Sequence, residues 1–142
     1  MPLPATYPEM PWRFLHSAQT ILEQVPPGRT HHWYTQANTA QSDTLVFIRA
    51  QLAPGACHGF HHHPEMDEMI FVISGEAEQW YESEKRVLKA GDMVYVPRGV
   101  VHATFNASVA ELDFLAILTP AKIEGPMTVD VSDQEPWSAL RV

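Results

Sequence analysis

Apolar and polar residues alternate along most of the chain between residues 44 and 118, in short segments separated by turn residues. This alternation is typical of β-strands with one buried face, and strands recurring about every eight to twelve residues indicate a sandwich or barrel. No helical period of useful length lies between them, so parallel βαβ units are not expected. We therefore predict an all-β fold, an antiparallel barrel or jelly roll, with strands at 44–52, 68–73, 76–82, 86–90, 92–97, 100–106 and 111–118.

The two ends of the chain have a different texture from this strand-rich region. Residues 1 to about 30 contain six prolines, and the stretch SAQTILEQV at 17–25 is the one place for a short helix there, with Ser17 as N-cap and Pro26 and Pro27 as its stop. We interpret this part as an N-terminal arm packed on the barrel. The last residues, from about 119, are again proline-containing and are expected to wrap the outside as a C-terminal extension.

Composition narrows the function classes. A chain of 142 residues with 45% apolar and 18% charged residues suits one globular domain, which we place at 1–142. A net charge of -8 argues against binding to nucleic acid or anionic membranes. The single cysteine, Cys57, cannot form an internal disulfide, and neither a signal peptide nor a membrane span is evident, so we expect a cytoplasmic protein with a small-molecule substrate.

The segment CHGFHHHPEMDE at 57–68 concentrates side chains that bind metals. Because side chains alternate on a strand, His61 and His63 face the same way. Glu68 opens the next strand, and His102, on a later strand, can complete the set from across the barrel. Three imidazoles and one carboxylate suit one divalent transition metal such as Fe, Mn, Ni or Zn. Such a set leaves coordination positions open, which favours a catalytic site over a structural one.

Two glycine-containing motifs surround these residues. The first is Gly55, five residues, His61, one residue, His63, four residues, Glu68, six residues, Gly75; the second is Gly91, five residues, Pro97, one residue, Gly99, two residues, His102, three residues, Asn106. They resemble the two signature motifs of the cupin superfamily. The resemblance covers about residues 45–118. In its compactness the chain resembles the small single-domain bacterial members of the family. It implies a jelly-roll β-barrel, also described as a double-stranded β-helix, and metal ligation by His61, His63, Glu68 and His102.

Other polar residues near the motifs have less definite roles. We expect His58 and His62 to face solvent or to support the ligands rather than bind the metal. Tyr95 is the one candidate for proton transfer, if its strand turns that face to the metal. Alternation predicts an apolar pocket poor in acid or base groups, lined by Ile70, Val72, Thr104, Phe114 and Ala116.

These features leave the reaction open. A divalent ion with one carboxylate keeps about one positive charge, which attracts an anionic or enolisable substrate. The shortage of proton-transfer groups favours a dioxygenase, an oxidoreductase resembling quercetinase-like cupins. The alternatives are a redox-neutral lyase or isomerase and a non-catalytic small-molecule binding module. Aromatic residues beyond the needs of one barrel, including Trp80 and Tyr81, predict a homodimer.

Overall fold

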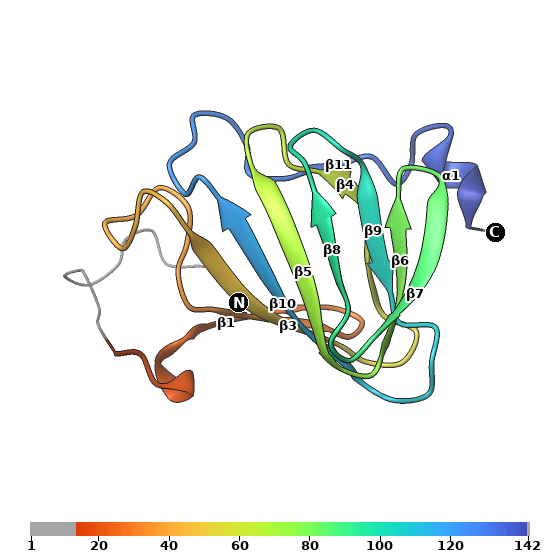
Figure 1. The fold of residues 1–142 in the computed structure, drawn as a ribbon, viewed down its shortest axis with the longest axis horizontal. Helices are drawn as coiled ribbons and strands as arrows, with labels where there is room; N and C mark the ends of the chain where they lie inside the picture. The colour runs from red at the N-terminus through yellow and green to blue at the C-terminus, as the bar shows by residue number, and fades with distance from the viewer. Residues whose placement is uncertain (1–13, 142) are drawn as a thin grey trace.

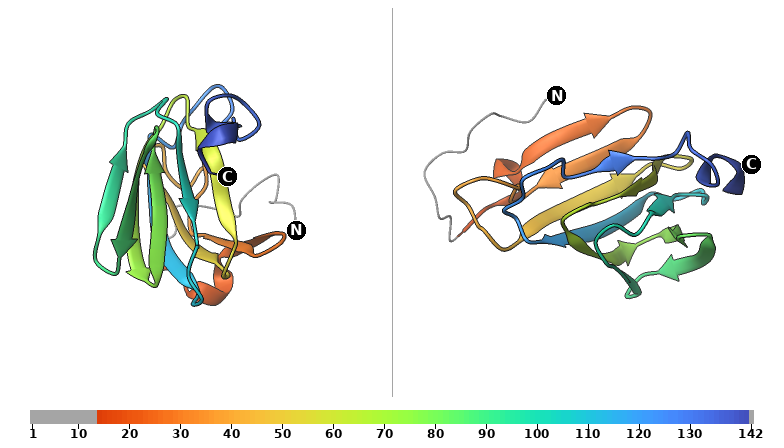
Figure 2. Two further views of the ribbon diagram at one scale, coloured as in Figure 1. Left: turned by 90° about the vertical axis from the view of Figure 1, so that its right-hand side faces the viewer. Right: turned by 90° about the horizontal axis from the view of Figure 1, so that it is seen from above.

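The protein is built from two antiparallel β-sheets that face each other, as the computed structural model of residues 14–141 shows (Figures 1 and 2). The first sheet has the order β1 (Ile21–Val25), β2 (Arg29–Trp33), β3 (Val46–Leu52), β10 (Leu112–Thr119), β5 (Asp67–Ser74) and β8 (Met93–Val96). The second has the order β11 (Val129–Asp130), β4 (Cys57–His62), β9 (His102–Phe105), β6 (Glu76–Tyr81) and β7 (Glu84–Lys89). The predicted all-β jelly-roll class, the double-stranded β-helix, is confirmed.

The strands follow the alternation in the sequence. Along β3 the residues are buried at every second position, and the inward side chains of β5 and β10 complete the same core. Leu52, Val72 and Leu112 are fully buried between the sheets. Burial of these inward faces is the main term that holds the two sheets together.

The predicted helix at 17–25 is wrong. Only Ser17–Gln19 is helical, as a single 3-10 turn, and Ile21–Val25 forms β1. Pro26 and Pro27, expected to stop a helix, lie in the turn to β2. β1 pairs with β2, and β2 pairs with β3, so hydrogen bonding to the barrel overrides the weak local helix preference. The predicted arm at 1–30 is thus part of the first sheet from residue 21 onward; residues 1–13 lie outside the described part.

The C-terminal extension covers the second sheet, as predicted. β11 pairs with β4, and the backbone N–H of Val131 donates to the carbonyl of Phe60 at 2.9 Å. Trp137, at the start of the short helix α1 (Trp137–Leu140), packs against the core that contains Phe60 and Val131. Neither this helix nor the 3-10 turn is long or apolar enough to span a membrane, and the cytoplasmic location stays a prediction.

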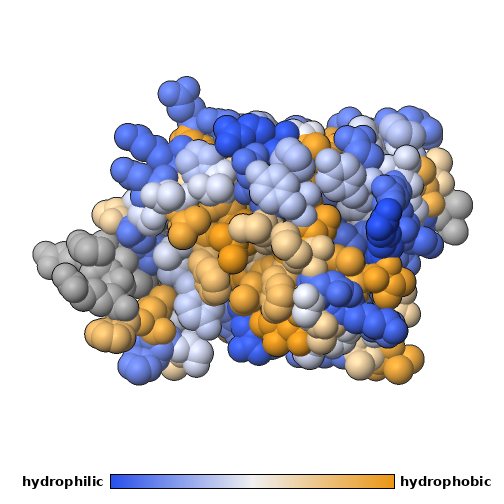
Figure 3. Space-filling model, in the orientation of Figure 1, coloured by the Kyte–Doolittle hydropathy of each residue, from blue (hydrophilic) through white to orange (hydrophobic). Residues whose placement is uncertain are grey.

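The outer face of β5 and β8 is unusually apolar. Met69, Phe71, Met93 and Tyr95 lie on paired positions of these strands and are 42% to 50% exposed. Figure 3 shows the apolar patch over this part of the surface. The homodimer predicted from the sequence stays a prediction, and this exposed apolar face is one surface suited to it.

The glycine between β5 and β6 gives a first testable prediction. Gly75 has a φ of +84°, and a Cβ added there would overlap the carbonyl oxygen of Glu111. We expect Gly75→Ala to lower the free energy of unfolding by about 3 kcal/mol or more, from backbone strain plus steric overlap. Gly91 has a φ of +92° but open space around it, so Gly91→Ala should cost only about 1–2 kcal/mol. Urea unfolding measures both, and equal losses would contradict the steric part.

Candidate metal centre

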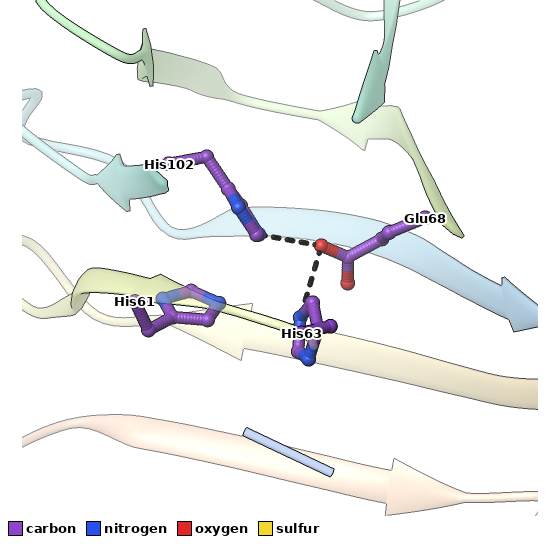
Figure 4. Close-up of side chains that lie close together, drawn as sticks. All are labelled: His61, His63, Glu68 and His102. Carbon is purple, nitrogen blue, oxygen red and sulfur yellow. Dashed lines mark hydrogen bonds and ion pairs between the residues drawn. The ribbon is translucent and has the colours of Figure 1, made fainter. Parts of the chain in front are cut away.

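Four buried side chains converge between the sheets (Figure 4). Pairing of β4 with β9 places His61 opposite His102, and His63 follows directly after the end of β4. Glu68 reaches the same point from β5 of the facing sheet. The potential ligand atoms of the four residues all lie within 4.8 Å of one another. The structure therefore brings together all four residues that the sequence singled out.

Each imidazole of the cluster is oriented by the backbone. The Nδ1 atoms of His61, His63 and His102 lie 2.6 Å, 2.9 Å and 3.0 Å from backbone carbonyl oxygens. A carbonyl oxygen only accepts, so Nδ1 carries the proton and donates it. Nε2 is then the nitrogen with a lone pair for a metal, and hydrogen bonds of this kind fix ligand imidazoles in metal sites.

The contacts inside the cluster test whether a cation fits. Glu68 Oε1 lies 2.7 Å from Nε2 of His102 and 3.4 Å from Nε2 of His63. Nε2 of His63 is buried and makes no hydrogen bond within the described residues. The imidazoles carry their protons on Nδ1, so their Nε2 lone pairs face the Glu68 carboxylate. This carboxylate therefore lacks a positive partner. A divalent ion among these atoms would satisfy all of them, so the cluster fits such a site.

The protonation states of His61 and Glu68 also favour metal binding. Burial, followed by the neighbouring His102, lowers the pKa of His61 to about 3, so its ring is neutral at physiological pH. Burial raises the pKa of Glu68, but the adjacent imidazoles of His102 and His63 outweigh it and hold that pKa well below its usual value. A neutral imidazole and an ionised carboxylate are the forms that ligate metals.

A cavity of about 320 Å³ opens beside the cluster. This volume is near the lower end of ligand-binding pockets, so the cavity suits a small molecule. The predicted lining by Ile70, Thr104, Phe114 and Ala116 is confirmed, whereas Val72 is packed in the core instead. The walls are predominantly apolar, and they also include Trp33, Ile48, Ala50, Leu118 and Met127.

The family model for the cupin domain matches residues 48–118, which is the region of both motifs and of all four cluster residues. The chain belongs to the cupin superfamily. Its fold agrees with solved cupins: KdgF from Halomonas sp. superposes with a TM-score of 0.67, at 21% identity, over 77% of this chain and 94% of that one. The polyketide cyclase RemF from Streptomyces resistomycificus superposes with a TM-score of 0.70, at 17% identity, over 91% and 98%.

Relatives with detectable sequence similarity align with only part of this cupin. It is 38% identical over 80 residues to an uncharacterized protein of Aquifex aeolicus, covering 56% of this chain and 60% of that one. It is 32% identical over 74 residues to an oxalate-binding protein of Thermotoga maritima, covering 51% and 60%. The chain thus spans about three-fifths of the length of these two relatives, and the single-domain organisation stays a prediction.

The expectation of a cavity poor in acid and base groups is wrong for this cupin. Glu23 on β1 and Arg29 and His31 on β2 line the cavity together with Trp33. The Glu23 carboxylate accepts hydrogen bonds from His31 Nδ1 at 2.9 Å and from Trp33 Nε1 at 3.2 Å. The bond from His31 lowers the pKa of Glu23 despite partial burial, so the carboxylate is ionised. The sequence did contain a signal for this strand. Arg29, His31 and Trp33 stand at every second position, as residues on one face of a strand do.

His58 also lies in the cavity wall, where its ring stacks on His61 at a centroid distance of 3.8 Å. This agrees with a supporting rather than a solvent-facing position. Strand alternation would place His58 and His61 on opposite faces, but the pairing of β4 with β9 shifts register between them. Cys57, which shares its parity with His61, is consequently outside the cavity. Gly59, inside the strand, was the available signal for such an irregularity.

Tyr95 does not reach the cavity, which corrects its candidacy for proton transfer there. It is 50% exposed on the outer face of β8, and its hydroxyl donates to Asp67 at 2.9 Å. Arg98 pairs with the same carboxylate at 3.2 Å. On β5, Asp67 and Glu68 point to opposite faces, so this outer group is separated from the cluster by the sheet. His62 is half-buried and likewise not part of the cavity wall.

Proposed function

We propose that this cupin is a metal-dependent enzyme that acts on a small anionic or enolisable substrate by redox-neutral proton transfer. His61, His63, Glu68 and His102 would hold one divalent transition metal. The observation that carries the proposal is the pair formed by His31 and Glu23, which lines the same cavity as the cluster. Acid–base groups beside a metal site are what a lyase, isomerase or cyclase requires.

The metal would supply Lewis-acid polarisation of a substrate oxygen. His31 is placed to move a proton: its Nδ1 donates to Glu23, which leaves Nε2 without a partner among the described residues and able to accept a proton from substrate carbon or oxygen. Trp33 holds Glu23 from the other side. A base oriented by a carboxylate is a recurrent catalytic arrangement. The predominantly apolar walls would limit contact of the bound substrate with water.

Dioxygenase chemistry, which the sequence alone favoured, is the second candidate. The set of three imidazoles and one carboxylate, next to a mainly apolar wall, also suits activation of oxygen by iron or nickel. The two candidates differ in whether molecular oxygen is consumed. Relatives named for oxalate binding and polyketide cyclisation are compatible with small, oxygen-rich or enolisable ligands.

Exchange of acidic C–H protons tests the proposal. Metal-loaded protein should accelerate deuterium incorporation from heavy water into acetylacetone or oxaloacetate, followed by NMR, at the same rate in air and under argon. The reason is that proton abstraction needs the metal and His31 but no oxidant. Loss of substrate that requires oxygen, with matching oxygen uptake, would establish the dioxygenase instead. Tight binding of these compounds without exchange or turnover would leave a binding module.

A further inference from the structure

Arg29 differs from every other arginine that the structure describes. Among residues 14–141 the others each form an ion pair with a carboxylate: Arg49 with Asp113, Arg86 with Glu84, Arg98 with Asp67, and Arg141 with Glu78. Arg29 has no ion pair in this part of the chain, and its Nε is buried without a hydrogen-bond partner there. It is half-buried at the beginning of β2 and lines the cavity of the metal centre.

The two carboxylates whose charges act on Arg29, those of Glu23 and Asp130, form their hydrogen bonds with other residues and not with Arg29. Glu23 accepts from His31 and Trp33. Asp130 accepts from the backbone N–H and the hydroxyl of Ser132, at 2.8 Å and 2.6 Å. Burial lowers the pKa of Arg29, and the charges of Glu23 and Asp130 only partly oppose this. A partly desolvated guanidinium with an unpaired N–H is costly, and an anionic ligand would offset that cost.

We infer that Arg29 binds a carboxylate of the substrate, at a distance from the metal centre within the same cavity. The planar guanidinium matches a carboxylate, with which it forms paired charge-assisted hydrogen bonds. The metal held by the cluster would accept a second oxygen of the ligand, and the predominantly apolar walls of the cavity would cover the carbon chain. The substrate class is therefore a short carboxylic acid with a further oxygen donor, such as a diacid or a keto acid. This inference rests on the proposed function in calling the ligand a substrate. The binding site itself does not depend on turnover.

Isothermal titration calorimetry of the metal-loaded protein measures ligand affinity and so tests the inference without any assay of activity. The probes are the straight-chain diacids from oxalate to glutarate, with acetate and propionate as monoacids and inorganic phosphate as a different anion. We expect one diacid length to bind best and Arg29→Gln to weaken that diacid about 10- to 100-fold, because a charge-assisted hydrogen bond is lost. Arg29→Lys should recover only part of the affinity, since the ammonium group is a point charge and cannot form the paired hydrogen bonds of a planar guanidinium.

A matched control separates the site from net charge. Arg86→Gln removes the same charge from an exposed position on β7 and should leave diacid affinity unchanged. Monoacid affinity should change little in Arg29→Gln, because one carboxylate can still bind the metal.

Three results would overturn the inference. They are equal loss of affinity in Arg29→Gln and Arg86→Gln, no binding of any diacid by the wild-type protein, or tighter binding of phosphate than of every diacid with loss in Arg29→Gln. Absence of proton exchange together with Arg29-dependent diacid binding would instead defeat the proposed function and leave this site intact.

Discussion

His61→Ala should weaken binding of a divalent transition metal by more than about 100-fold, because loss of outer-sphere partners alone costs 10- to 100-fold and His61 is placed as a direct ligand. The adjacent substitution His62→Ala should leave the affinity unchanged. Both residues are on β4, but only His61 belongs to the buried cluster. Competition titration against a coloured chelator measures both affinities.

The pair of variants controls for damage to the strand. Both remove an imidazole from the same segment, so circular dichroism should report the same fold for each. Glu68→Gln, which keeps the shape of the side chain but removes its charge, should also lose most of the affinity. Equal metal affinity in His61→Ala and His62→Ala would contradict the assignment of the cluster.

His31→Gln should lower the rate of proton exchange into acetylacetone or oxaloacetate by about 100- to 10,000-fold, the range typical of a lost general base. Metal content should be unchanged, since His31 is not one of the four cluster residues. Glu23→Gln should reduce the rate less, because the imidazole remains but its orientation by the carboxylate is lost.

His32→Gln is the matched control for this second prediction. His32 is the next residue on β2, and its Nε2 lies 2.9 Å from Gln51 Oε1, away from the cavity. Its replacement should leave the exchange rate within about twofold of wild type. If His31→Gln kept the wild-type rate at full metal content, proton transfer by this pair would be excluded.

The barrel and the metal cluster were predictable because the sequence encodes them locally. Strands such as 44–52 and 111–118 alternate apolar and polar residues, which reflects their single buried face. The cluster follows from the residues and from the two motifs. His61 and His63 share a strand face, and Glu68 and His102 occupy the positions in the motifs that the resemblance to cupins implies for ligands. Position 75 requires glycine because its φ is positive and because the backbone of Glu111 leaves no room for a Cβ.

The acid–base side of the cavity was not predictable by the same reasoning. β1 exists because it pairs with β2 and, through it, with β3, and such contacts between distant segments leave little trace in a proline-rich stretch. His58 supports the cluster from the cavity wall, a position that strand parity alone did not give, because parity fails across the register shift after it. Tyr95 was a candidate only because parity does not say which face of a strand is inside, and the outer face carries it.

Elemental analysis of the native protein decides whether the four converging side chains hold a metal. The protein should be purified without a metal-affinity step and analysed for iron, manganese, nickel and zinc. We expect about one divalent transition metal ion per chain, removed by a chelator and restored by adding the same metal. A native protein that contains no metal and takes up none on addition would contradict this expectation.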